Sequence, residues 1–399
     1  MALLIGGSSV RGVASNWVVQ IVTLALAPAL VDWRRPCGYW PVVNWLLIAI
    51  LVLLVAQLLP LGWLLGSVGT AAPGVSLPAP FALTVDWWRT AEALLFVLPL
   101  AVVFVVLGRF TVNDFNRLLP FLYLGLLFNV VFGLVQFAAR TGISPGYLPY
   151  ETAAGFFANQ NHFATLMFVG IPLVIYQFVA IKRPMLSLIA VAIIVLASFA
   201  TRSLAGAVLS IGAALVSYAL VVPLRMHWRI ALLCAAVAGA VVLSFNPGNV
   251  LEFRAGDPLD RLAIWRTTAS AIPAYLPFGS GAGSFELVYP RFEAAADVRY
   301  SFINHAHNVY LERMLEGGVP AALLMAAGVL LIGRAMWRRP RTPLRWAAFC
   351  GLLFILAHSF VDYPLRTPAL ALIFVVLSAI VFCHQSEQNT SAQPSRQLS

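Results

Sequence analysis

The sequence predicts an all-α, polytopic integral membrane protein with about 10–12 transmembrane helices. Of its 399 residues, 61% are hydrophobic and only 10% are charged, whereas soluble domains carry about 25% charged residues because their surface faces water. Apolar runs of roughly 20 residues, long enough to cross a hydrocarbon core, recur along most of the chain. Lipid offers the backbone no hydrogen-bonding partners, so these runs must be helices.

Eleven apolar runs are predicted to cross the membrane. The first is short and follows Arg11, and Pro60 interrupts the second, which is therefore either one tilted helix or a broken pair. These two runs do not determine on which side of the membrane the N-terminus lies. The predicted spans are 16–31, 40–66, 91–108, 118–138, 162–181, 185–200, 203–223, 230–246, 309–333, 343–361 and 368–384.

Basic residues orient the spans. Thirteen of the 25 Lys and Arg residues lie in five short segments between apolar runs, which are 34–35, 109–117, 182–183, 225–229 and 334–345. Such segments mark the cytoplasmic side, so topology explains the net charge of +10 and nucleic acid is not an expected partner. The outward connections are then 67–90, 139–161, 201–202, 247–304 and 362–367, and the spans from residue 91 onward alternate without a skipped crossing.

The pattern divides the chain into four parts. Residues 1–246 form N-terminal transmembrane helices, 247–304 a large periplasmic loop, 305–384 C-terminal transmembrane helices, and 385–399 a cytoplasmic tail expected to be disordered. A loop as long as 247–304 is usually functional or disordered. Its many aromatic residues favour an ordered cap with one or two short helices.

Polar residues at the outward ends of the spans are the candidates for chemistry. Asn159 and Asn161 precede a span, where their amides are suited either to bind sugar hydroxyls or to cap the helix. Arg202 stands alone between two apolar runs, on the side where the positive-inside rule does not place it. It is suited to snorkel toward lipid phosphates or to bind a substrate phosphate with its planar fork of donors.

The large loop adds two arginines. Arg261 and Arg266 are five residues apart, so on a helix they lie on different faces and need not serve one ligand. Asp260 is expected to pair with an arginine at the surface. The glycine-rich run 277–283 does not indicate a nucleotide site, because it follows no strand and precedes no Walker lysine.

The strongest candidates lie where the loop meets the next span, at His305, His307 and Asn308. Two histidines two residues apart suit a metal, but no cluster of carboxylates or thiolates accompanies them, and no metal is expected. A general base fits better, because imidazole titrates near neutral pH and accepts a hydroxyl proton. Glu312 and Glu316 follow on the same apolar helix, where ionisable residues usually pair or line a cavity.

The last outward connection contributes an acid and a base to the same face. His358 and Asp362 lie at the end of the penultimate span, and Arg366 follows four residues later. The favoured interpretation is that Asp362 and Arg366 pair across a tight turn.

These residues resemble the motifs of the O-antigen ligase and O-antigen polymerase superfamily, which are membrane glycosyltransferases that use polyprenyl-diphosphate-linked glycans. The most specific match is His307-Asn308 followed by nine residues and Gly318; three residues later the family has Gly, Thr or Tyr, and this chain has Ala321. The resemblance covers about residues 120–384. Its supporting matches are 157–164, 201–203, Arg261 with Trp265, and 277–279.

The resemblance implies roles for individual residues. His307 is expected to be the catalytic base, and Arg202 and Arg261 to bind the lipid diphosphate, with Arg266 as a further candidate. Asn159, Asn161, His305, Asn308 and Asp362 are the candidates for binding glycan or acceptor. The family looks metal-independent and inverting, with a helical architecture like that of the glycosyltransferase-C class and no cofactor.

The expected function is that of a bacterial inner-membrane glycosyltransferase whose active site faces the periplasm. Its donor would be a glycan linked to undecaprenyl diphosphate, and its acceptor a sugar hydroxyl on the lipid A core (a ligase) or on a growing glycan such as O-antigen or exopolysaccharide (a polymerase). Membrane lipids surround it. The alternative is a multi-pass transporter or flippase of an anionic or lipid-linked substrate, which would place ionisable residues near the middle of the bilayer.

Overall fold

The computed structural model describes residues 1–9, 13–30, 32–59, 83–139, 153–245, 258–295, 298 and 302–383. Helices dominate these residues, which contain no strand beyond an isolated bridge between Gly7 and Phe157. The all-α, polytopic fold class is therefore confirmed. The predicted tail 385–399 lies outside the described residues.

Six of the described helices are long and apolar enough to cross a membrane. They are α3 (Pro41–Leu58), α4 (Trp87–Leu107), α5 (Val112–Ala139), α6 (Gln160–Ala180), α8 (Leu204–Val221) and α12 (Val309–Arg338). Further apolar helices accompany them: α2 (Ala14–Leu26), α7 (Pro184–Ala200), α9 (Met226–Phe245), α13 (Pro343–His358) and α14 (Pro368–Phe382). The chain is thus a multi-pass membrane protein.

The predicted spans correspond to these helices. Every span predicted from residue 91 onward overlaps one helix from α4 to α9 or from α12 to α14, and the first span corresponds to α2 with the 3-10 turn η1 (Ala27–Leu30). The predicted span 40–66 corresponds to α3 as far as Leu58, and its residues from 60 onward lie outside the described part of the chain.

Helix starts follow local capping chemistry. The side chains of Asn159, Ser203 and Asn308 accept backbone N–H groups at the starts of α6, α8 and α12, which satisfies donors that a helix leaves unpaired. Proline opens α3, α7, α13 and α14, where its missing N–H costs nothing.

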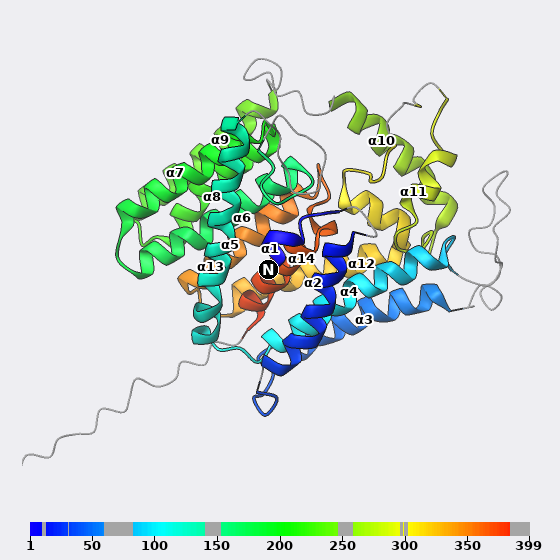
Figure 1. Ribbon diagram of the computed structural model, residues 1–399, viewed down its shortest axis with the longest axis horizontal. Coiled ribbons are helices and arrows are strands. Elements are labelled where there is room, and N and C mark those ends of the chain that lie inside the picture. The colour runs from blue at the N-terminus through cyan, green and yellow to red at the C-terminus, as the bar shows by residue number, and fades with distance from the viewer. Residues whose placement is uncertain are drawn as a thin grey trace, which may run out of the picture.

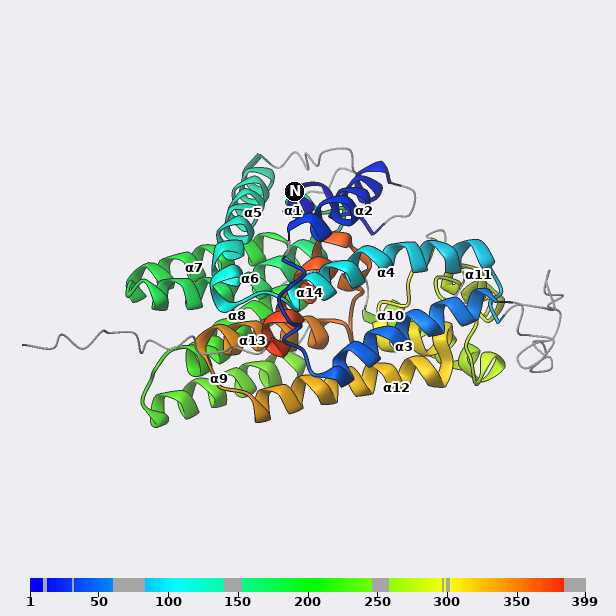
Figure 2. The ribbon, with the colours of Figure 1, turned by 90° about the horizontal axis from the view of Figure 1, so that it is seen from below.

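The helices form two groups. Helices α5–α9 pack with α13 in one group, while α3 and α4 pack with α12 and α14 in the other. Figure 1 shows the first group on the left and α3 and α4 on the right, with α14 between them. In Figure 2, α3, α4 and α12 run side by side toward α11 (Phe285–Val288).

The centre of the first group is α6. Every residue from His162 to Ile175 is buried, whereas large apolar side chains on the peripheral helices are exposed, among them Phe121, Met185 and Leu330. Outward-facing apolar side chains on so many helices are what a lipid environment requires.

A cap sits on the start of α12. It comprises α10 (Pro258–Ala271), η2 (Ile272–Tyr275), α11 and η3 (Tyr289–Arg291), and its small apolar core includes Tyr275, Phe285 and Tyr289 together with Leu315 of α12. The expectation of an ordered cap with short helices thus agrees with the described part of the loop.

The glycine-rich run of the cap docks on a break in α12. At Gly318 the backbone has φ 59° and ψ −151°, and Val319 N–H donates to the Pro277 carbonyl at 2.8 Å. Ser280 N–H and Gly281 N–H donate to the carbonyls of Leu315 and Glu316, both at 2.9 Å. The run therefore binds α12 through its backbone.

Candidate active site

The connections that the sequence predicts to face outward meet at one end of the bundle. Ala153 N–H donates to the Ala200 carbonyl at 3.1 Å, which joins the segment before α6 to the turn that holds Arg202. Ala158 N–H donates to the Gly7 carbonyl at 3.2 Å, and Ala369 N–H donates to the carbonyl of the neighbouring Gly6 at 3.0 Å. The N-terminal residues, with the short helix α1 (Ala2–Ile5), therefore lie at the same end as the candidate site.

His307 stands immediately before the cap residue of α12. Its Nδ1 lies 3.4 Å from Asp362 Oδ1, and its side chain is 25% exposed. Its φ is 48°, a left-handed conformation that non-glycine residues seldom adopt and that costs of order 1–3 kcal/mol. Because Nδ1 faces the carboxylate, Nε2 is the ring nitrogen left to meet a substrate.

Asp362 is fully buried between two histidines. Besides His307, it has His358 Nε2 at 3.9 Å from its Oδ2. Burial alone raises the pKa of the Asp362 carboxyl. Contact with His307 and the charges of His162 and His358 outweigh burial, so this pKa lies well below its ordinary value. The carboxylate is therefore ionised at neutral pH and can orient an imidazole.

Tyr363 supports the histidines from the other side. Its ring lies 4.2 Å from the ring of His305, 4.9 Å from that of His307 and 5.0 Å from that of His162, measured between centroids. Burial raises the pKa of the Tyr363 hydroxyl well above its ordinary value, and the charge of Asp362 adds to this. A neutral aromatic ring thus fixes the orientation of the imidazoles.

Arg261 reaches this cluster from the cap. Its Nη1 donates to the carbonyl of Val361 at 2.9 Å, one residue before Asp362 in the chain. That bond uses one of the five N–H groups of the guanidinium, and the side chain remains partly exposed. A fixed positive charge therefore stands beside the His307–Asp362 pair.

Arg202 lies at the same end but is not joined to the cluster. It follows α7 with φ 53°, a position that usually favours glycine, and its side chain is exposed. Arg266 is also exposed, on α10. Among the described residues, no hydrogen bond or ion pair connects either arginine to His307, so their part in binding a diphosphate stays a prediction.

His305 has a different environment from His307. It is buried, and its Nδ1 lies 2.9 Å from Glu312 Oε1, while Ala306 N–H donates to the other oxygen of Glu312 at 3.0 Å. This carboxylate thus holds the loop before α12 in place, and His305 is a structural partner of Glu312.

The expected pairing of Asp362 with Arg366 is wrong. Arg366 instead binds Glu312 and Glu316, with Nη2 2.8 Å from Glu316 Oε2. Burial alone lowers the pKa of Arg366, but the two carboxylates raise it above its ordinary value. Glu312 and Glu316, which lie 54 and 50 residues before Arg366 in the sequence, bind its guanidinium. Asp362 therefore remains available to the histidines.

The asparagines serve as helix caps. Asn308 Oδ1 accepts from the N–H groups of Tyr310 and Leu311 at 3.0 and 3.1 Å, and Asn159 Oδ1 accepts from Asn161 N–H at 2.8 Å. The capping interpretation accounts for both oxygens. Glycan binding by these residues stays a prediction.

Sequence reasoning did not assign Arg366, Tyr363 or His162 to the site. A signal for Arg366 existed, because Glu312 and Glu316 lie in apolar surroundings and need a cation, and Arg313 is too near them in the sequence to neutralise both. Tyr363 and His162 carried no such signal. In the part of the chain that the structure describes, no three His, Cys, Asp or Glu side chains are arranged to hold a metal ion.

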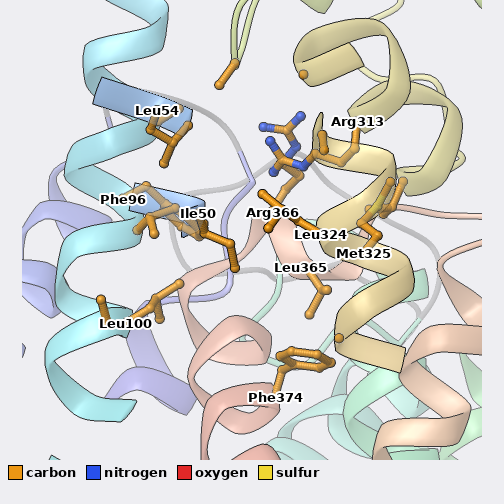
Figure 3. Close-up of a pocket in the computed structure, with 18 of the residues that line it drawn as sticks. Ile50, Leu54, Phe96, Leu100, Arg313, Leu324, Met325, Leu365, Arg366 and Phe374 are labelled. Atoms are coloured by element: carbon orange, nitrogen blue, oxygen red, sulfur yellow. The ribbon is translucent and has the colours of Figure 1, made fainter. Parts of the chain in front are cut away.

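A cavity of about 510 Å³ adjoins the cluster. Its walls are mainly apolar side chains of α3, α4, α12 and α14, and its polar lining residues include His305, Arg313 and Arg366. Figure 3 shows the guanidinium groups of Arg313 and Arg366 close together above the apolar side chains. The cavity is therefore amphipathic, with its polar end beside the histidines.

Comparison with known protein families identifies a matching region of the chain. Residues 152–326, which include His307, Arg261 and Arg202, match a family model described as O-antigen ligase. No curated protein matches the chain.

Proposed function

We propose that this chain, which through residues 152–326 belongs to the O-antigen ligase and polymerase superfamily, transfers a glycan from undecaprenyl diphosphate to a sugar hydroxyl. The membership supports a membrane glycosyltransferase at the level of the family. The donor, the inverting mechanism and the independence from metal are the proposal's own.

The observation that carries the proposal is the His307–Asp362 pair with Arg261 beside it. An imidazole within 3.4 Å of a fully buried carboxylate is arranged as a general base with an orienting acid. The guanidinium of Arg261, bonded to the adjacent Val361 carbonyl, supplies positive charge. Three separate segments contribute these groups at one end of the bundle.

The reaction would be a single displacement at the anomeric carbon. The acceptor oxygen forms the new bond to C1 while its proton passes to Nε2 of His307. The bond between C1 and the diphosphate oxygen breaks, and its electron pair leaves with the diphosphate. Arg261 stabilises the developing negative charge, assisted by Arg202, and Asp362 stabilises the protonated imidazole.

The amphipathic cavity supports a donor with a prenyl chain. Along α12 its lining runs from Val309 to Ile332, which corresponds to about 35 Å of helix and is comparable to the thickness of a hydrocarbon core. In the donor, only the diphosphate lies between the reacting carbon and the prenyl chain. A prenyl chain in this cavity would begin beside His305, which is two residues from the proposed base His307.

The proposed setting is the bacterial inner membrane, with the site facing the periplasm. The acceptor is either the lipid A core or another growing glycan, so ligase and polymerase activities are both compatible with the site. No step requires a cofactor, because the arginines supply the charge that a metal ion supplies elsewhere.

The central test combines glycan profiles and purified protein. His307→Ala should lower transfer from a lipid-linked glycan by about 10²–10⁴-fold, as expected for a lost general base, and Arg261→Ala should also lower it. His227→Ala, which removes an exposed histidine from the start of α9, and Leu262→Ala on α10 are the matched controls. Normal glycan profiles in a knockout strain complemented with both site variants would refute the assignment. Activity should persist in chelator.

The cavity is tested separately. Leu324 lines it, whereas Leu323 on the same helix is 65% exposed outside it. We expect Leu324→Trp to raise the KM for the prenyl-linked donor about tenfold or more. This increase is what the loss of burial of roughly two methylenes of the prenyl chain would cause. Leu323→Trp should leave the KM unchanged. Equal donor KM values for both variants would exclude a chain from this cavity.

A further inference from the structure

Arginines gather at the end of the bundle opposite the candidate site. Arg334 and Arg339 belong to the last part of α12 and its cap, and both lie over the ring of Trp40, with Cζ 5.5 and 4.7 Å from the ring centroid. Trp40 is the residue before α3. Helices α3 and α12 pack against each other, and Figure 2 shows them side by side.

Among the residues that the structure describes, this arginine group has no acidic partner in an ion pair. Ion pairs among the described residues involve neither Arg334 nor Arg339, although they do involve Arg35, Arg89, Arg313 and Arg366. Arg339 is only 8% exposed, and its Nη2 donates to the Gly38 carbonyl at 3.2 Å. Its Nε is buried without a hydrogen-bond partner. A buried cation with an unsatisfied donor is costly unless an anion approaches it.

The surroundings identify the kind of anion. Trp40 is an aromatic residue at a helix end, the arrangement typical of a membrane–water interface. Directly along α12 toward the membrane centre, the large apolar side chains of Val329 and Leu330 are exposed. An anion bound here therefore has an apolar surface beside it, which suits a molecule that carries both a phosphate and hydrocarbon chains.

We infer that Arg334 and Arg339, together with Trp40, bind the phosphate of an anionic phospholipid in the leaflet opposite the candidate active site. The planar guanidinium matches phosphate oxygens, and each cation near an anionic membrane surface contributes about 1 kcal/mol. The site is independent of the proposed glycosyl transfer, because no residue of the histidine cluster takes part.

The experiment measures lipid binding to the full-length protein. Purified protein receives phosphatidylglycerol or phosphatidylcholine in detergent, and native mass spectrometry gives the affinity while thermal unfolding gives the stabilisation. Arg334→Gln removes an exposed member of the pair, so folding should be preserved. Arg338→Gln is the matched control, because Arg338 is exposed four residues away on the same helix and has no contact with Trp40 among those described.

We expect the wild type to prefer phosphatidylglycerol, Arg334→Gln to bind it about fivefold more weakly, and Arg338→Gln to bind it as the wild type does. Trp40→Leu should weaken binding as well. Equal affinity for the two lipids, or equal losses from Arg334→Gln and Arg338→Gln, would overturn the inference and leave only a diffuse positive field. Full stabilisation by inorganic phosphate alone would instead assign the site to a soluble anion.

Discussion

At the scale of the residue, the candidate site depends on which acidic side chain pairs with which basic side chain. Arg366 occupies Glu312 and Glu316, and Asp362 remains to face His307. If Arg366 paired with Asp362 instead, His307 would lose its orienting carboxylate and Glu312 would be buried without an arginine partner. The buried ion cluster of Arg366, Glu312 and Glu316 therefore keeps Asp362 available to orient the proposed base His307, although the cluster takes no part in the proton transfer.

We expect Arg366→Met to be strongly destabilising. The side chains of Glu312 and Glu316 are 2% and 1% exposed, so removing their shared cation should cost about 3–5 kcal/mol of unfolding free energy. The measurement is thermal unfolding in detergent. Arg35→Met is the control, because Arg35 contacts Asp114 at 2.9 Å with 49% of its side chain exposed and such surface pairs contribute about 0–1 kcal/mol. Equal losses would show that the cluster does not stabilise the fold.

At the scale of the element, α12 carries the site because its first turns are held from outside. Asn308 caps its start, and the cap binds it at the break around Gly318. A Cβ at Gly318 would lie 2.1 Å from the Pro277 carbonyl oxygen, and one at Gly279 would lie 2.4 Å from the Glu316 carbonyl oxygen. Glycine at both positions is thus what lets the cap approach the helix closely enough to bring Arg261 to the cluster.

Gly318→Ala should therefore destabilise the protein and lower its activity. The φ and ψ of Gly318 fall in a region that is nearly exclusive to glycine, with a cost of about 1–3 kcal/mol for other residues, and the clash adds to it. Gly333→Ala on the same helix is the matched control: a Cβ there meets no atom within 4 Å, and alanine should stabilise the helix by about 0.5–1 kcal/mol. Unfolding temperatures of both variants test this. A Gly318→Ala protein as stable as the wild type would contradict the role of the break.

At the scale of the whole molecule, the two ends of the bundle differ in chemistry. One end gathers histidines, buried acids and paired arginines. The other gathers Arg334 and Arg339 around Trp40, with Arg109 lying 4.6 Å from the ring centroid of Trp33. This asymmetry is what the positive-inside rule predicts for a protein with its active site on the outer face.

The proposed orientation is tested by labelling single cysteines. In a variant without the four native cysteines, Arg266→Cys at the site end should react with a membrane-impermeant maleimide in intact spheroplasts. Lys182→Cys, on an exposed turn between α6 and α7, should react only after permeabilisation. The reverse pattern would place the candidate site in the cytoplasm and exclude a periplasmic acceptor.

The fold class, the positions of α4–α9 and α12–α14, and the place of His307 at the start of a helix follow from the sequence alone. They depend on hydropathy and capping, which act between residues close together in the chain. The pairing of Arg366 with Glu312 and Glu316, the contact of Asp362 with His307, and the packing of Tyr363 against three histidines were decided only by the tertiary structure. These contacts join segments from α6, α12 and the turn after α13, and a charged side chain with several possible partners takes the one that packing brings within reach.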